Sequence, residues 1–321
     1  MSNIIRPPGD AGTTPEVPSI VVGYRRLGQL KQTLTAVLEH HRGPVYVFLD
    51  APNPTGGPRA IEECEAVLEW VSRQQDQHER MKVLRPERNL GVVRAMPAAI
   101  DWVLGDGHDN FVLLEEDCLP SPDFYPFMRA MLHRFEDDHR VAMVSGNQFL
   151  PSHLAAKSNS SYYFSRYAHI WGWGAWRRSW STYDHSMSAL NDPAVRENLR
   201  SLFARRREQY FYESVWDRQL ASPSDSAWAS RWLLAMLLHR GLCICPRSNL
   251  VTNLGFGSGS THTARASRYH AIPHAPLTWP LRHPLHVVEW LAADRWWFDH
   301  LISKAPLSRI RRYLPSIRRN G

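Results

Sequence analysis

The chain has 321 residues, of which 43% are hydrophobic, and carries a formal net charge of +7. This length and composition are typical of one large globular domain or two small ones, and they exclude a largely disordered chain. No run of 18 apolar residues occurs, so we expect no membrane-spanning helix, and the polar, proline-rich first twenty residues are unlike a secretory signal.

The cysteines and the late arginines bear on where the protein works. The cysteines match no zinc-binding spacing, so we expect free thiols in a reducing cytoplasm at Cys64, Cys118, Cys243 and Cys245. Arginines cluster in the last thirteen residues, as a tail that is either solvated or in peripheral contact with an anionic membrane surface. No recognised motif accompanies this charge, so we do not expect nucleic acid as a partner.

Strands and helices alternate after a leader over residues 1–17 that we expect to be disordered. Apolar runs predict strands at 19–23, 45–49, 81–84, 111–114 and 141–144, and helical periodicity predicts helices at 27–38, 61–71, 92–104 and 124–135. This alternation is typical of an α/β fold with a mainly parallel central sheet flanked by helices. Such sheets bind ligands beyond the carboxyl ends of their strands, which is where we expect the site.

The pattern changes after about residue 150. Residues 160–185 are dense in aromatic side chains, helical patterns follow at 193–220 and 226–240, and a strand is predicted at 242–245. We therefore expect one domain in two halves, residues 18–150 and 151–270, followed by a basic helical tail over 271–321.

Three consecutive acids, Glu115, Glu116 and Asp117, end the most apolar predicted strand. Adjacent carboxylates repel one another unless a cation offsets their charge, and oxygen ligands suit Mg²⁺ or Mn²⁺. Alternation along a strand would point Glu115 and Asp117 to one side and Glu116 to the other. A solvated acidic turn or a helix N-cap is the alternative interpretation.

Two further segments each have a functional and a structural interpretation. The glycine-rich loop 255–263 could line an anion site, and its His262 could bind a metal or a diphosphate, although a lone histidine is more often structural. In the run from Trp171 to Trp176, aromatic faces could stack on a sugar and Gly174 could let a ligand approach the backbone. Core packing is the commoner role of such rings.

The order of these motifs resembles that of the bacterial GT-A glycosyltransferases, a family-2-like group related to animal N-acetylglucosaminyltransferase I. The resemblance runs from about residue 18 to 265. It rests on Val21-Val22-Gly23-Tyr24-Arg25-Arg26, Arg88-Asn89-Leu90-Gly91, Leu113-Leu114-Glu115-Glu116-Asp117, Pro120-Ser121-Pro122-Asp123-Phe124, Tyr167-Ala168-His169-Ile170-Trp171-Gly172-Trp173-Gly174, Pro246-Arg247-Ser248-Asn249-Leu250-Val251-Thr252-Asn253 and the loop from Gly255 to Thr263.

This resemblance implies a GT-A fold and the transfer, with inversion, of a hexosyl or N-acetylhexosaminyl group from a nucleotide-diphosphate sugar, with a UDP-sugar favoured. The acceptor would be a hydroxyl of a glycan, a lipid-linked molecule or a small molecule. Residues 18–150 would bind the nucleotide sugar, and residues 151–270 would bind the acceptor and complete the catalytic site.

The resemblance also implies a role for each matching residue. Asp117 would bind Mn²⁺ or Mg²⁺, with His262 as a second ligand or near the diphosphate, and Asp50 would contact the nucleotide base. The remaining positions expected at the nucleotide sugar are Tyr24, Arg25, Arg26, Arg88, Asn89, Gly91, Glu115, Glu116, Trp173 and Gly174.

One position departs from the family pattern. Where relatives carry a Trp-Asp pair whose aspartate resembles the catalytic base, this chain has Trp228-Ala229. Alanine cannot accept a proton, so three interpretations remain open: Asp225 or Asp217 takes over the role, the alanine is an inactivating substitution, or the protein binds a nucleotide sugar without transferring it. A sugar nucleotidyltransferase is disfavoured, because the segment from Gly23 to Gly28 lacks the expected glycine-rich loop with a basic residue.

Overall fold

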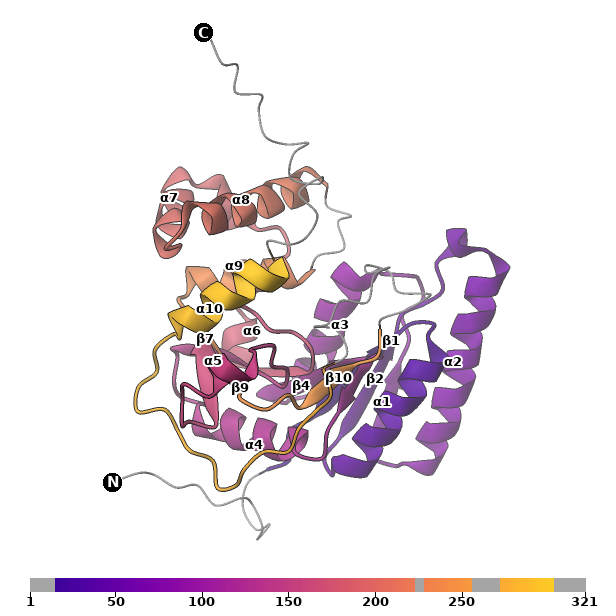
Figure 1. Cartoon of the computed structure of the whole chain (residues 1–321). Coiled ribbons are helices and arrows are strands. Elements are labelled where there is room, and N and C mark those ends of the chain that lie inside the picture. Colours follow the sequence, from indigo (N-terminus) through magenta and orange to yellow (C-terminus); the bar gives the residue numbers. More distant parts are fainter. Residues whose placement is uncertain (1–14, 223–227, 256–271, 303–321) are drawn as a thin grey trace.

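A computed structural model describes residues 15–222, 228–255 and 272–302 (Figure 1). Within these residues, eight strands form one sheet in the order β3-β2-β1-β4-β8-β6-β9-β7, and β10 and β5 form a separate two-stranded ribbon. Helices cover both faces of the large sheet. The predicted α/β architecture, with a mainly parallel central sheet flanked by helices, is confirmed.

The predicted strands and helices of the first half are present with small changes at their ends, except for the helix predicted at 61–71, which extends from Gly57 to Gln77. The strands are β1 Ser19–Gly23, β2 Val45–Leu49, β3 Met81–Leu84, β4 Asn110–Glu115, β5 Cys118–Pro120, β6 Val141–Ser145, β7 Tyr162–Ser165, β8 Trp173–Trp176, β9 Leu242–Pro246 and β10 Val251–Asn253. The main helices are α1 Leu27–His40, α2 Gly57–Gln77, α3 Val92–Gly105, α4 Phe124–Arg134, α7 Pro193–Leu202, α8 Arg206–Ala221, α9 Trp228–Leu238 and α10 Leu291–Trp297. Shorter turns are η1 Pro54–Gly56, α5 Ser152–Ala155, α6 Arg177–Trp180, η2 Ser188–Asn191 and η3 Phe298–Ile302.

Parallel pairing brings the ends of the first strands to one edge of the sheet. Strand β1 lies between β2 and β4 in parallel register, with Gly23 opposite Leu49 and Val22 opposite Glu115. Strand β8, from the aromatic segment, inserts antiparallel between β4 and β6. The segments that follow β1, β2 and β4 therefore begin side by side.

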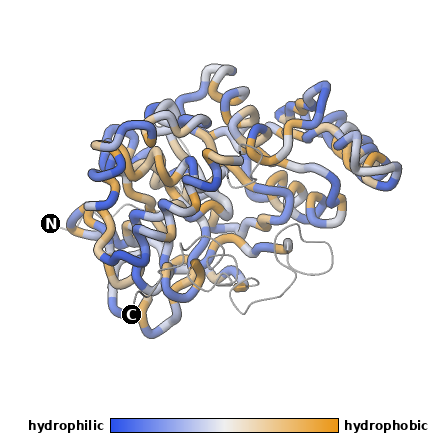
Figure 2. The backbone as a smooth tube through the Cα atoms, turned by 90° about the horizontal axis from the view of Figure 1, so that it is seen from above, coloured by the Kyte–Doolittle hydropathy of each residue, from blue (hydrophilic) through white to orange (hydrophobic). Residues whose placement is uncertain are grey.

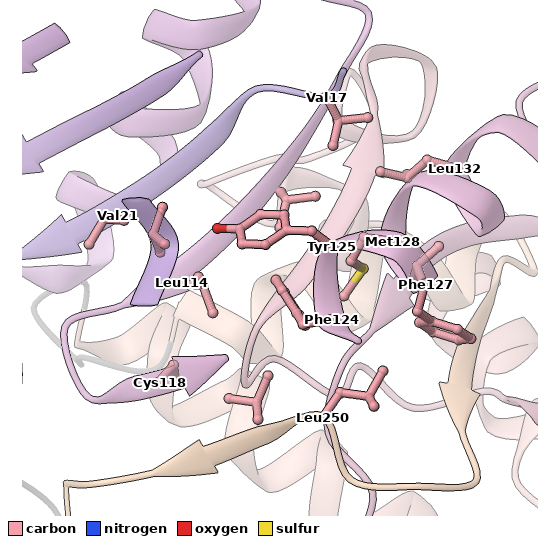
Figure 3. Close-up of a cluster of buried hydrophobic side chains, with 14 of the residues drawn as sticks. Val17, Val21, Leu114, Cys118, Phe124, Tyr125, Phe127, Met128, Leu132 and Leu250 are labelled. Carbon is pink, nitrogen blue, oxygen red and sulfur yellow. The ribbon is translucent and has the colours of Figure 1, made fainter. Parts of the chain in front are cut away.

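One face of the sheet packs against α1, α2 and α4. Alternate strand residues such as Val21 and Leu114 point to this side, where they meet Leu34 of α1 and Phe124 and Met128 of α4. Figure 3 shows part of this cluster, in which side chains of α4 lie against those of the strands. Burial of this apolar surface stabilises the half of the domain that carries the strand ends.

The opposite face packs against α3, α5, α9 and α10. Ile20, Leu113 and Trp173 point to this side and meet Ile100 of α3 and Trp232 of α9. Hydrophobic and hydrophilic residues alternate at short intervals along the backbone tube (Figure 2). A third apolar cluster joins α7, α8, α9 and η3, away from the large sheet.

Two predictions, one about the second half and one about the N-terminal leader, need correction. The helix expected at 193–220 is two helices, because the chain is extended at Phe203 and Arg205, and the Phe203 ring stacks on Tyr212. The leader does not extend to residue 17, since Val17 is buried and Glu16 pairs with Arg129.

The segment expected to be a helical tail from residue 271 is not helical between residues 272 and 290. It runs along the outside of α4 and bonds to edge strand β7, where Trp290 N–H donates to the Phe164 carbonyl at 2.8 Å. The arginine-rich residues from 303 onward lie outside the described residues. Among the described residues, no helix is both long and apolar enough to cross a bilayer, and the four cysteines are buried free thiols as predicted.

Candidate nucleotide-sugar site

The loop after β1 and the acids after β4 meet at the carboxyl edge of the sheet. Glu116 accepts a hydrogen bond from the Tyr24 backbone N–H at 2.7 Å and pairs with the Arg26 guanidinium through Nε. Arg26 Nη1 lies 2.8 Å from Asp117 Oδ2. One arginine therefore bridges two of the three predicted acids.

The prediction that the acidic side chains point to alternate sides is wrong beyond Glu115, because β4 ends there and the chain turns. Glu116 and Asp117 both face Arg26 and are only 5% and 8% exposed. The turn is held by Thr33, whose Oγ1 donates to the Glu116 carbonyl at 3.0 Å. Thr33 was missed from the sequence, although it is a buried polar residue on the apolar face of α1.

Burial and mutual repulsion set the charges of this cluster. Burial, and then the charge of Asp117, raise the pKa of Glu115 to about 8, against the opposing effect of Arg26. Burial alone would lower the pKa of Arg26, but the charges of Glu116 and Asp117 outweigh it and raise that pKa above its ordinary value. The site thus holds a guanidinium cation among carboxyl groups, of which Glu115 is the one most easily protonated.

The β10–β5 ribbon returns the chain to Asp117. Asn253 pairs with Cys118, and Leu254 N–H donates to the Asp117 carbonyl at 2.7 Å. Gly255 packs so closely that a β-carbon there would collide with Asp117 Oδ2. The ribbon therefore fixes Asp117 at the start of the glycine-rich loop, whose remaining residues, including His262, lie outside the described residues.

Asp50 is placed at the same edge but has a structural role. Its Oδ1 accepts from the backbone N–H groups of Ala51 and Leu90, and its Oδ2 accepts from Gly91 N–H and Asn89 Nδ2, all at 2.9–3.0 Å. A carboxylate has about four acceptor positions, and all four are used. Asp50 therefore clamps the turn at 89–91, and its contact with a nucleotide base stays a prediction.

This clamp explains the conformation of the turn. Burial raises the pKa of Asp50, while the N–H groups of Leu90 and Gly91 oppose that rise. Gly91 has φ +68°, which favours glycine. Asn89 and Gly91 are thus held at the edge through Asp50, and Arg88 is exposed beside them.

The other two residues of the first loop lie at its outer side. The Tyr24 hydroxyl accepts a hydrogen bond from Asn53 N–H at 3.1 Å, which links the loop after β1 to the loop after β2. Arg25 is exposed, and its nearest carboxylate is Glu63 at 3.8 Å. Both side chains therefore border the acid cluster without entering it.

The predictions for Trp173 and Gly174 are wrong, because both are buried core positions. Trp173 has no exposed surface, and it packs on Phe111, Trp228 and Trp232 at ring-centroid distances of 5.2–5.9 Å. Gly174 leaves no room for a side chain against the Phe111 carbonyl. Neither position can reach a sugar while the core is intact.

The structure disfavours one of the two substitute bases. Asp217 lies on α8, is half-exposed, and pairs with Arg196 of α7 at 2.9 Å. It therefore belongs to the helices that stand away from the sheet. Ala229 packs at the border of the second core cluster, and Asp225 lies outside the described residues.

The chemistry at Asp117 fits a divalent cation that is shared with phosphate oxygens. Within the described residues, the one hydrogen-bond donor to Asp117 Oδ1 is the weak thiol of Cys118 at 3.7 Å, so this oxygen is available for the hard cations that prefer oxygen. Residues 15–222, 228–255 and 272–302 contain no group of three or more His, Cys, Asp or Glu that could hold a metal by themselves. Asp117 Oδ1 is therefore the candidate oxygen for Mn²⁺ or Mg²⁺, and the predicted second ligand, His262, lies outside the described residues.

The sequence matches no protein-family model and has no match among the curated proteins. Solved structures that the chain resembles include a mannosyltransferase from Pyrobaculum calidifontis in complex with GDP-Man and Mn²⁺, at 16% identity and a TM-score of 0.39, over 56% of this chain and 48% of that one. Another is residues 1–349 of S. aureus TarS, at 11% identity and a TM-score of 0.39, over 71% and 57% of the two chains. A third is GalNAc-T7 with UDP, GalNAc and Mn²⁺, at 14% identity and a TM-score of 0.37, over 52% and 36%. The chain thus spans about half of the mannosyltransferase and about a third of GalNAc-T7.

Proposed function

We propose that the protein is a GT-A glycosyltransferase that transfers a sugar from a nucleotide-diphosphate donor, with a UDP-sugar favoured, to an acceptor hydroxyl. The observation that supports this is the convergence of Arg26, Glu116 and Asp117 at the carboxyl edge of a parallel sheet. That edge is where such sheets bind ligands. Arg26 presents a guanidinium suited to phosphate, and Asp117 presents an oxygen suited to a divalent cation.

The contacts of the first-half residues support the following roles. Asp117, together with His262, would hold Mn²⁺ or Mg²⁺, which offsets charge on the leaving diphosphate when it is bound. Glu116 orients Arg26 and fixes the loop after β1. Asp50 keeps the turn at 89–91 in place beside the donor. Tyr24 and Arg25 would line the outer side of the donor site.

Inversion requires a base that removes the proton of the acceptor hydroxyl. Of the candidate acids, Asp225 is preferred over Asp217, which is paired with Arg196 on the outer helices. Ala229 motivates the second candidate function, a protein that binds a nucleotide sugar without transferring it. The acceptor would be a glycan, a lipid-linked molecule or a small molecule, bound by residues 151–270 at the cytoplasmic face of a membrane or in the cytoplasm.

A donor panel tests the proposal and separates the two functions. The protein is incubated with UDP-, GDP- and dTDP-sugars and Mn²⁺, and nucleoside diphosphate release is followed with and without acceptor extracts. We expect release from one donor, lost in Asp225→Asn. Binding without release, with release restored by Ala229→Asp, would support the non-transferring function, and absence of binding to every donor would refute both.

Asp117→Ala tests the metal assignment. We expect Mn²⁺-dependent nucleotide binding to fall at least tenfold by calorimetry, because the carboxylate that faces both Arg26 and Gly255 is removed. Asp109→Ala is the matched control, since the Asp109 side chain is 88% exposed and lies just before β4, at the opposite edge. Unchanged affinity in Asp117→Ala would refute the assignment.

A further inference from the structure

Asp117, the residue assigned to the divalent cation, already has a cation bound. Arg26 Nη1 lies 2.8 Å from Asp117 Oδ2, and the side chains of Arg26 and Asp117 are 23% and 12% exposed. Gly255 closes the space beside the same oxygen. A charge-assisted pair that is this sheltered from water is screened little by salt.

A guanidinium and a divalent cation cannot occupy Asp117 equally well at the same time. Their like charges repel at short range, and the guanidinium uses one of the two carboxylate oxygens. Arg26 is therefore a built-in competitor of the metal at this residue. A metal ion on the other oxygen, Oδ1, would repel the guanidinium and so weaken the contact between Arg26 Nη1 and Asp117 Oδ2.

Glu116 keeps the displaced guanidinium at the site. Arg26 Nε remains paired with Glu116, which is itself held by the Tyr24 N–H at 2.7 Å and, through its carbonyl, by Thr33 at 3.0 Å. Release from Asp117 therefore frees the Nη groups of Arg26 without releasing the side chain. Free Nη groups on a tethered guanidinium are well suited to bind phosphate oxygens.

We propose that Arg26 exchanges partners, from Asp117 in the metal-free protein to the donor diphosphate when a divalent cation binds. This inference rests on the proposed function and adds a coupling to it. Each ligand removes the obstacle to the other, because the cation takes Asp117 and the diphosphate takes Arg26. Such coupling between two ligands is reciprocal.

Calorimetric titrations of Mn²⁺ alone, and of UDP at saturating Mn²⁺, test the exchange in the full chain. In Arg26→Gln we expect Mn²⁺ alone to bind about tenfold more tightly than in the unchanged protein, because the loss of one sheltered ion pair is comparable to a tenfold change in affinity. We expect UDP at saturating Mn²⁺ to bind about tenfold more weakly. A merely structural role for Arg26 would weaken both.

Arg73→Gln is the matched control. It removes the same charge from an exposed position on α2, where the guanidinium pairs with Glu69 at 3.4 Å, and should change the affinity for Mn²⁺ alone less than twofold. Should Arg26→Gln fail to fold, Arg26→Lys serves in its place: it keeps one positive charge but cannot contact both acids in the same way, and should also tighten Mn²⁺ binding.

The possible outcomes separate this inference from the proposed function. If UDP and Mn²⁺ bind but the Arg26 variants bind Mn²⁺ alone no more tightly, the exchange is refuted and the proposed function stands. If neither ligand binds to the unchanged protein or to any variant, the exchange is refuted, and the proposed function is refuted as well only if no sugar of the donor panel binds.

Discussion

Replacement of Asp50 by asparagine tests whether this residue holds the site together or contacts a nucleotide base. Asp50 is 7% exposed and accepts four hydrogen bonds, three of them from backbone N–H groups. In Asp50→Asn, an NH₂ group replaces one of the two oxygens. Two acceptor positions are lost, and the two N–H donors that pointed at that oxygen then face an NH₂ group, which can only donate.

The size of the effect follows from those contacts. A hydrogen bond to a charged group contributes about 1.5–3 kcal/mol, so the loss of two costs about 3–6 kcal/mol. The asparagine recovers part of this, because burial opposes the charge of Asp50 and raises its pKa. We expect the free energy of unfolding to fall by about 2–4 kcal/mol.

Urea denaturation of the ligand-free protein measures this change. Asp109→Asn is the control, because the Asp109 side chain is 88% exposed, and its effect should stay below about 0.5 kcal/mol. A loss smaller than about 1 kcal/mol in Asp50→Asn would refute the clamp. If UDP affinity then fell while stability did not, the original expectation of a base contact would be supported instead.

Two further variants test the buried acid on α10 and the ribbon. Burial raises the pKa of Asp294 to about 7, against the hydrogen bond from Ser165. Between about pH 4 and 7 the native state therefore binds a proton that the unfolded chain has released. The free energy of unfolding falls as pH rises through this range. In urea titrations between pH 4 and pH 8, the free energy of unfolding of Asp294→Asn should fall by up to about 4 kcal/mol less than that of the unchanged protein. The same pH dependence in both proteins would contradict the assignment. Gly255→Ala should weaken Mn²⁺-dependent UDP binding about tenfold, because the new β-carbon displaces the Asp117 carboxylate. Gly28→Ala, where a β-carbon meets nothing within 4 Å, is the control, and equal affinities in the two variants would count against the role of Gly255.

The sequence was sufficient for features that depend on local patterns. Helical spacing in Leu30, Leu34 and Val37 indicates one buried face of α1, and uninterrupted apolar runs such as Val45 to Leu49 indicate strands covered on both sides. These patterns predicted the α/β alternation and, through the rule for parallel sheets, the edge where Asp117 lies. They repeat every two or 3.6 residues, so a short stretch of chain contains the whole signal.

The tertiary structure decided which residues meet at that edge. The Arg26–Asp117 pair joins positions 91 residues apart, and the Asp50 clamp joins positions about 40 apart. Trp173 is an aromatic residue of the kind that can stack on a sugar, but β8 inserts between β4 and β6, and Trp173 is therefore buried. Such contacts depend on strand order and register, which arise from the packing of the whole chain and leave no periodic trace in the residues themselves.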